Sequence, residues 1–140
     1  MRFTLIDRIV ELEPGVKITA LKALTQASAW LVRVSEDFAH SMVLLRQAAN
    51  VKYGQFLEPG QTLVVAAEIV EDGARETRLK ARGTVDGQVI VSARLVLAKY
   101  NLSDSRPGYE RADRATRQDL REAFALLYQP GAPVRETSTS

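Results

Sequence analysis

The chain has 140 residues, a length typical of one domain that buries its core without disulfide bonds. Its net charge is only +2, with basic and acidic residues interleaved, which argues against the basic stripe of a nucleic-acid-binding protein. It contains no cysteine, which excludes disulfides and thiolate chemistry and favours a cytoplasmic location. The opening segment MRFTLIDRIVELEPG has acidic residues and no long apolar run, so we expect neither a signal peptide nor a membrane anchor.

The first third of the chain predicts two strands and a helix. Phe3 to Glu13 and Lys17 to Leu21 are predicted as strands that flank the turn dipeptide Pro14-Gly15. A helix follows, because apolar residues recur at helical spacing: Leu24, Ala27, Leu31, Val34 and Phe38. No Gly, Pro, Asn or Asp occurs from Lys17 to Arg33, although strand-to-helix loops usually take about 2–6 residues. The sequence therefore predicts an unusual junction without a linker.

The middle of the chain predicts an antiparallel meander. Apolar residues alternate with polar ones in strands around Ser41–Tyr53, Leu63–Ile69, Thr77–Val85 and Val89–Leu97. Asp86-Gly87 joins the last two as a two-residue hairpin, since a type I′ turn requires positive φ at both of its central residues. The expected fold is α+β, with a curved antiparallel sheet wrapped around one central helix.

The C-terminal part predicts a second helix, from about Asp113 to Leu127, which Pro130 ends. A tail from residue 129 to residue 140 is predicted to be disordered. Four arginines of this helix interleave with acidic residues: Arg111, Arg114, Arg117 and Arg121. This pattern favours a solvated helix face, although an acidic helix of a carrier protein could also dock on these arginines. The expected division is a main domain of residues 1–100, a helical extension of residues 101–128, and the tail.

Few residues suggest chemistry. The sequence has no P-loop, dinucleotide-binding or zinc-protease motif, and with one histidine and no cysteine it predicts no metal site and no cofactor. His40 follows the helix, and we interpret it as a structural or surface residue because only Glu36 and Asp37 lie near it in sequence. Substrate-binding candidates are aromatic residues that would line an acyl tunnel, or else belong to the core or a dimer edge: Trp30, Tyr53 and Phe56.

Three segments between Arg2 and Ala98 resemble, in the same order, the β-hydroxyacyl-[acyl-carrier-protein] dehydratases of fatty-acid synthesis. They are RFTLIDRIVELEPGVKITALKALT, VKYGQFLEPGQTL and KARGTVDGQVIVSARLVLA. The resemblance implies a hotdog fold over residues 1–100 and a homodimer or higher even oligomer formed through sheet edges. It also implies 3-hydroxyacyl thioesters as substrates, elimination of water to give the trans-2-enoyl thioester, and an acyl carrier protein as partner, with no nucleic acid and no membrane.

The catalytic motifs of that family are absent here. The family has a His-Phe-Pro loop, which this chain lacks, and a glutamate in the first turns of the helix. Aligned from Gln26, the glutamate position falls on Lys22, which by alignment from Pro14-Gly15 belongs to the preceding strand. We therefore expect a segment to be missing near Lys22–Ala23, and we assign no catalytic residue.

Three hypotheses follow. The preferred one is a dehydratase-like hydro-lyase whose working form contains the missing segment. The second is a degenerate hotdog protein that binds acyl chains or a carrier protein, or that serves as a partner subunit. The third is a hotdog thioesterase that uses a carboxylate-activated water in place of the histidine.

Overall fold

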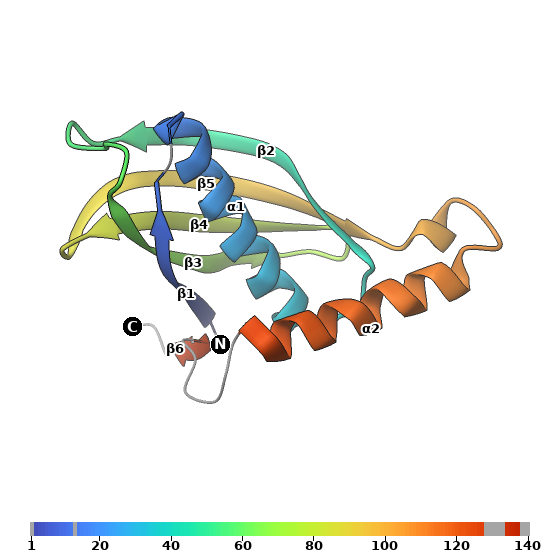
Figure 1. The fold of residues 1–140 in the computed structure, drawn as a ribbon. Helices are drawn as coiled ribbons and strands as arrows, with labels where there is room; N and C mark the ends of the chain where they lie inside the picture. Colours follow the sequence, from blue (N-terminus) through green and yellow to red (C-terminus); the bar gives the residue numbers. More distant parts are fainter. Residues whose placement is uncertain (1, 13, 128–133, 138–140) are drawn as a thin grey trace.

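The computed structural model describes the backbone of residues 2–12, 14–127 and 134–137, and the side chains of residues 12 and 14–126. Strands and helices follow one another along the chain as shown in Figure 1: β1 (Arg2–Glu11), α1 (Val16–Ser35), β2 (Met42–Tyr53), β3 (Thr62–Asp72), β4 (Glu76–Val85), β5 (Gln88–Tyr100), the 3-10 helix η1 (Leu102–Asp104), α2 (Glu110–Leu127) and β6 (Val134–Thr137).

The strands form one six-stranded antiparallel sheet in the order β2-β5-β4-β3-β1-β6. The sheet curves around α1, which contacts every strand from β1 to β5 (Figure 1). Leu24 and Leu31 of α1 are almost fully buried against inward residues of the sheet, including Leu63, Leu79 and Leu95. This arrangement confirms the α+β class, the single central helix and the C-terminal helix, and it matches the expected hotdog architecture.

The predicted meander is present as β3, β4 and β5. Asp86 and Gly87 both have positive φ, 50° and 79°, as a type I′ turn requires. The register pairs Val85 with Gln88 across this turn and continues to Glu76 opposite Ala98. None of the described helices is long and apolar enough to span a membrane.

The predicted strand from Lys17 to Leu21 is wrong, because these residues form the first turns of α1. The helix begins at Val16, directly after Gly15, whose φ of 86° lets the chain turn sharply out of β1. The Thr19 N–H donates to the Gly15 carbonyl at 3.1 Å, the first bond of the helical ladder. The link between β1 and α1 is therefore residues 12–15, and no linker-free junction exists near Lys22.

Two further boundaries differ from the sequence prediction. The central helix ends at Ser35 rather than Phe38, because Asp37 and Phe38 adopt positive φ, 53° and 57°. Phe38 belongs to the loop after the helix, and its side chain is buried. Val134–Thr137, predicted as part of a disordered tail, form β6 and pair with β1. The rest of the tail and Pro130 lie outside the described residues, and the division into residues 1–100 and 101–128 stays a prediction.

Candidate functional site

An apolar groove of about 430 Å³ lies between the first turns of α1 and the edge strand β2. Ile18 and Leu45 are 78% and 40% exposed beside it, an unusual amount of apolar surface for neighbouring side chains. Its lining is continuous along these two elements: Lys17, Ile18, Leu21, Lys22, Thr25, Gln26, Leu45 and Tyr53. The groove is thus open, mainly apolar, and bordered by two lysines.

Tyr53 ties the end of β2 to the start of α1. Its hydroxyl donates to the Lys17 carbonyl at 3.2 Å, and the Lys17 ammonium lies 5.3 Å from the centre of its ring. Thr25 and Gln26, adjacent in the chain, add polar groups to the lining, and the Thr25 hydroxyl donates to the Leu21 carbonyl at 2.9 Å. Among the residues whose side chains the structure describes, no carboxylate and no imidazole lines the groove, and α1 contains no Asp or Glu.

The three aromatic candidates occupy different places. Tyr53 lines the groove, whereas Trp30 packs under α2, with its ring 5.9 Å from that of Phe124 and 5.1 Å from the Arg33 guanidinium. Phe56 is 64% exposed in the loop between β2 and β3. The structure therefore brings one of the three to the groove, and a tunnel lined by all three stays a prediction.

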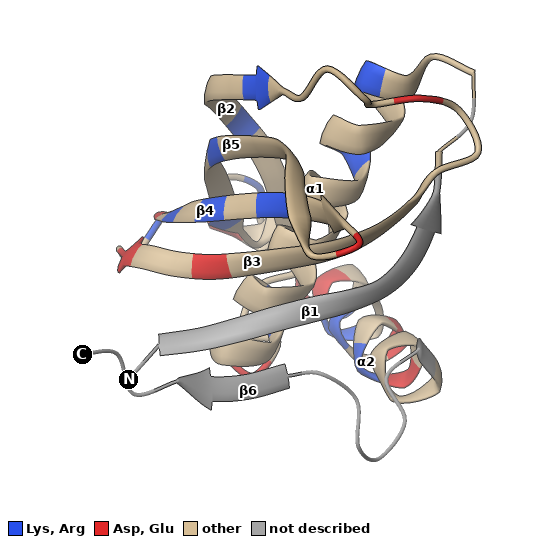
Figure 2. Cartoon of the chain, turned by 90° about the vertical axis from the view of Figure 1, so that its left-hand side faces the viewer, with Lys and Arg blue, Asp and Glu red and all other residues tan. Residues whose placement is uncertain are grey.

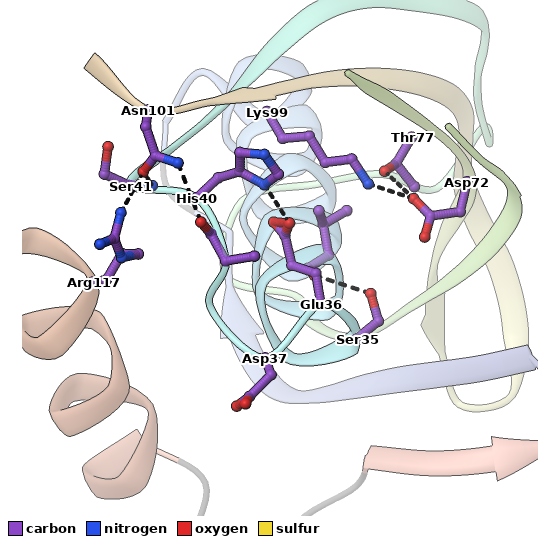
Figure 3. Close-up of polar contacts among 12 residues, drawn as sticks. Ser35, Glu36, Asp37, His40, Ser41, Asp72, Thr77, Lys99, Asn101 and Arg117 are labelled. Atoms are coloured by element: carbon purple, nitrogen blue, oxygen red, sulfur yellow. Dashed lines mark hydrogen bonds and ion pairs between the residues drawn. The ribbon is translucent and has the colours of Figure 1, made fainter. Parts of the chain in front are cut away.

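His40 lies at the other end of α1, where the helix gives way to β2. From Gln26 to Glu36 the helix rises about 15 Å, so His40 cannot serve the groove of its own chain. Its Nδ1 shares a hydrogen bond with Glu36 Oε2 at 2.5 Å, an orientation that a general base would need. Figure 3 shows both side chains beneath the end of the sheet. The structure thus supplies the carboxylate partner that sequence proximity only suggested.

Unsatisfied polar atoms surround this His40–Glu36 pair. Glu36 Oε1 and Arg33 Nε are buried and make no hydrogen bond with a described residue. Burial lowers the pKa of the Arg33 guanidinium, and the Glu36 carboxylate opposes that shift. Within the described part of the chain, no group of three His, Cys, Asp or Glu side chains could hold a metal ion.

A second polar cluster joins the ends of β3, β4 and β5. The Lys99 ammonium, whose side chain is 5% exposed, contacts Asp72 Oδ1 at 2.6 Å, and the Thr77 hydroxyl donates to the same oxygen at 2.8 Å (Figure 3). Burial acts to raise the pKa of Asp72, but hydrogen bonds from Lys99 and Thr77 outweigh it and hold that pKa below its ordinary value. The cluster is satisfied internally, which is typical of a structural ion pair.

Of the eight groove residues, only Tyr53 was a sequence-based candidate, and the other seven were missed. Three of them, Lys17, Ile18 and Leu21, had been assigned to a strand, which placed their side chains on a sheet rather than beside one. The signal that would have found them is the helical spacing of Ala20, Leu24, Ala27 and Leu31, all buried, which extends the apolar stripe back to the Pro14-Gly15 turn.

Comparisons with known proteins agree with the fold and show sequence similarity to one group of enzymes. No protein-family model matches the chain. A 3-hydroxyacyl-[acyl-carrier-protein] dehydratase, FabZ, from Ruminiclostridium cellulolyticum is 27% identical over 122 positions, which cover 69% of this chain and 86% of the relative. Among solved structures, the dehydratase heterocomplex ApeI:P from Xenorhabdus doucetiae has a TM-score of 0.54 at 18% identity and covers 67% of both chains. An acyl-CoA hydrolase from Staphylococcus aureus has a TM-score of 0.53 at 11% identity and covers 89% of this chain and 92% of its own.

The structural similarities define the class, because a curved sheet around one central helix recurs in both neighbours at low sequence identity: the chain is a hotdog-fold protein. Within that class the sequence similarity is to FabZ dehydratases, and the chain lacks the His-Phe-Pro motif and the helix glutamate that this resemblance implies.

Proposed function

We propose that the chain binds 3-hydroxyacyl or trans-2-enoyl thioesters in the groove at the start of α1. The groove carries this proposal, because it has a volume of about 430 Å³ beside the central helix, and Ile18, Leu21 and Leu45 give it apolar walls that an alkyl chain can contact. Binding sites for such ligands are concave and mostly apolar, with a few polar groups at the rim. The FabZ relative, whose name specifies a 3-hydroxyacyl thioester, supports this class of ligand.

Elimination of water needs a base that removes the α-proton and an acid that protonates the leaving hydroxyl, each within hydrogen-bonding reach. The groove residues include neither a carboxylate nor an imidazole. We therefore propose that a chain of this sequence binds the thioester without dehydrating it, the second of the three hypotheses.

Dehydration is assigned to a form with an additional internal segment. The FabZ alignment spans 122 positions but only 69% of the 140 residues of the chain, so the relative has residues inside the aligned range that the chain lacks. This difference supports the proposal of an insertion that would supply the missing acid and base. We keep its proposed position near Lys22–Ala23, two residues that lie within α1 rather than at a strand-to-helix junction. In that form the chain would be a 3-hydroxyacyl thioester hydro-lyase of fatty-acid synthesis in the cytoplasm.

The open edge of β2 favours pairing with a second copy. β2 is an end strand that pairs only with β5, and Leu44 and Leu45 on it are 47% and 40% exposed. We propose a homodimer, or a higher even oligomer, formed through this edge, and an acyl carrier protein as the partner that delivers the acyl chain. The heterocomplex formed by a solved structural neighbour supports an assembly with another hotdog subunit.

Calorimetry with 3-hydroxydecanoyl pantetheine tests the binding proposal. Leu21→Glu and Leu45→Glu should each weaken binding at least about tenfold, since a carboxylate in the groove must be desolvated. Leu126→Glu is the matched control, because Leu126 is 78% exposed on α2, far from the groove. Equal binding by all three variants would refute the groove as the site.

Two assays test the reaction. Hydration of a crotonyl thioester by a chain of 15.5 kDa would contradict the non-catalytic proposal, and release of free thiol from an acyl-CoA would instead indicate a thioesterase. The intact mass of the protein purified from its natural host tests the longer form. A mass clearly above 15.5 kDa that includes additional residues within α1 supports it, and a mass of 15.5 kDa rejects it.

A further inference from the structure

A basic hollow lies on the face of the sheet opposite α1. It has a volume of about 480 Å³ and is formed by neighbouring residues of β2, β4 and β5: Asn50, Lys52, Lys80, Ala81, Arg82, Ser92, Ala93 and Arg94. Four of these side chains are cationic, two are neutral hydrogen-bonding groups, and none is a carboxylate. In Figure 2, which views the molecule from one side of Figure 1, basic residues lie on β2, β5 and β4 and acidic residues lie on β3.

The cations of the basic hollow are not neutralised by the described part of the chain. Lys52, Lys80, Arg82 and Arg94 make no ion pair or hydrogen bond with any described residue. The single acid on β2, β4 and β5 is Glu76, which is engaged by Arg46. Glu68 of β3 stands opposite Lys80 in the register and bounds the hollow on that side, so the unneutralised charge is greatest toward β5 and β2.

The strand register places like charges together. Lys80 of β4 is directly opposite Arg94 of β5, and Arg82 is the next outward residue of β4 along from Lys80. Like charges in directly opposed positions destabilise a sheet. A surface that serves only solubility would be more stable with an acid at one of these positions, so the arrangement indicates an anion that binds there.

The backbone of β2 is also distorted at the basic hollow. The register with β5 shifts between Ala49 and Lys52, and Asn50 within that bulge has a φ of 53°. Positive φ is uncommon for a residue other than glycine, and bulges re-aim side chains next to functional sites. Here the bulge places both Asn50 and Lys52 in the lining of the hollow.

We propose that the basic hollow binds phosphate groups. Lysine and arginine side chains form charge-assisted hydrogen bonds with phosphate oxygens, and the Ser92 hydroxyl and Asn50 amide are further donors. No aromatic side chain lines the hollow, so it lacks the stacking platform that single-stranded nucleic acids use. The charge arrangement thus suits compact phosphate esters.

The arginines of α2 are a weaker candidate for the same ligand. Arg117 donates to Asn101 at 2.7 Å, and Arg121 pairs with Asp37 at 3.0 Å, so two of the four arginines there are already engaged. The acids Asp119 and Glu122 share that helix. The basic hollow has no comparable internal partners.

Phosphate esters could reach the basic hollow from two sources, the phosphates of coenzyme A or the phosphopantetheine of a carrier protein. This pair of sources rests on the proposed function, whereas the phosphate site itself does not. Lys52 of the hollow immediately precedes Tyr53 of the groove, so the two sites lie on opposite faces of the same end of β2. A thioester carrier would therefore have its acyl and phosphate parts recognised near one strand end.

Calorimetry on the full chain with pyrophosphate, coenzyme A, pantetheine and holo-carrier protein tests this proposal. Pyrophosphate and at least one of the two carriers should bind, more weakly at high salt. Lys80→Gln should weaken that affinity and Arg94→Glu should reduce it about tenfold or more. Circular dichroism should show an intact fold, because Lys80→Gln removes the like-charge contact with Arg94 and Arg94→Glu creates an oppositely charged cross-strand pair with Lys80. Arg114→Glu on α2 is the matched control, with the same change in charge, and should bind pyrophosphate as the parent does.

The outcomes separate this site from the acyl groove. No binding of any phosphate-bearing probe, or equal loss in Arg114→Glu and Arg94→Glu, would overturn the proposal. If Leu21→Glu leaves pyrophosphate binding unchanged, the phosphate site is supported. If acyl pantetheine fails to bind in the same experiments, only the proposed function is rejected. Coenzyme A binding without holo-carrier binding supports the nucleotide thioester as source, and the reverse supports the carrier-linked phosphate.

Discussion

The Ser41 hydroxyl, at the start of β2, donates a hydrogen bond to the Asp113 carboxylate of α2, with 2.5 Å between Oγ and Oδ1. Asp113 is 1% exposed and also accepts the backbone N–H groups of Leu102 and Ser103 at 2.8 and 2.9 Å. One carboxylate thus fastens α2 and η1 to the end of the sheet. Burial acts to raise its pKa, but these hydrogen bonds outweigh burial and hold the pKa of Asp113 well below its ordinary value.

Asp113→Asn should lower the melting temperature by several degrees at pH 7. The Asp113 carboxylate accepts hydrogen bonds from Ser41, Leu102 and Ser103. The NH2 group of an asparagine cannot accept a hydrogen bond, so at least one of these buried donors would lose its acceptor, which is costly. Differential scanning calorimetry measures the change. Asp119→Asn, on the exposed part of the same helix, is the control and should melt as the parent does.

The same carboxylate predicts a pH dependence. Because the folded-state pKa of Asp113 lies below the ordinary value of 3.8, its stabilisation is complete well above pH 3.8 and is lost as the pH falls through and below it. The difference in melting temperature between parent and Asp113→Asn should therefore be constant from pH 6 to 8 and shrink below about pH 4. A difference that grows on acidification would contradict this assignment.

Lys22→Pro should destabilise the protein by about 3 kcal/mol or more, because it removes a hydrogen bond from the interior of α1 and its ring clashes with the preceding turn. Lys22→Ala, which keeps the helix and removes the same side chain, should be close to neutral. Urea unfolding measures both. If Lys22→Pro were tolerated, α1 would not run unbroken through this position, and the strand-to-helix junction that the sequence predicted near Lys22 would be supported instead.

The sequence predicted most strands because period-2 alternation and the Asp86-Gly87 turn are local signals. It failed at Lys17–Leu21 because two of these five residues, Ile18 and Thr19, are β-branched, which favours a strand, and the segment follows the turn dipeptide Pro14-Gly15 directly. The helical spacing of Ala20 with Leu24, Ala27 and Leu31 pointed the other way, and the packing of Ala20 and Leu24 on the sheet decides for a helix. Tertiary burial thus overrode local preference.

The candidate sites were less predictable than the fold. Tyr53 was identified by its aromatic ring, but the basic hollow depends on which residues face one another across strands. Lys80 and Arg94 are 14 positions apart in sequence and become neighbours only through the hairpin register, so overall charge balance concealed them. The sequence showed only that Glu36 and His40 are four residues apart. Their hydrogen bond depends on the turn that the chain makes after Ser35, which the sequence did not predict.

Phe124→Ala should loosen the C-terminal half of α2. The Phe124 ring contacts Trp30 at 5.9 Å and Phe38 at 6.0 Å between ring centres, so its loss uncovers both. We expect a cost of about 1–2 kcal/mol, less than for a fully buried phenylalanine. Trp30 is the single tryptophan of the chain, so its fluorescence reports the change directly and should shift to longer wavelength. Unchanged emission would show that α2 does not cover Trp30 in solution.

The Lys99–Asp72 pair predicts unequal costs for its two halves. Asp72→Ala leaves the Lys99 ammonium, 5% exposed, without its partner and should cost about 3 kcal/mol, whereas Lys99→Met leaves a carboxylate that is 49% exposed and should cost about 1 kcal/mol or less. Since the folded-state pKa of Asp72 lies below 3.8, the pair stabilises the fold above that pH and weakens as the pH falls through the folded-state value. Urea unfolding at pH 7 and pH 3 measures both effects. Equal costs for the two variants at pH 7 would show that the exposed carboxylate, rather than the buried ammonium, determines the energy of the pair.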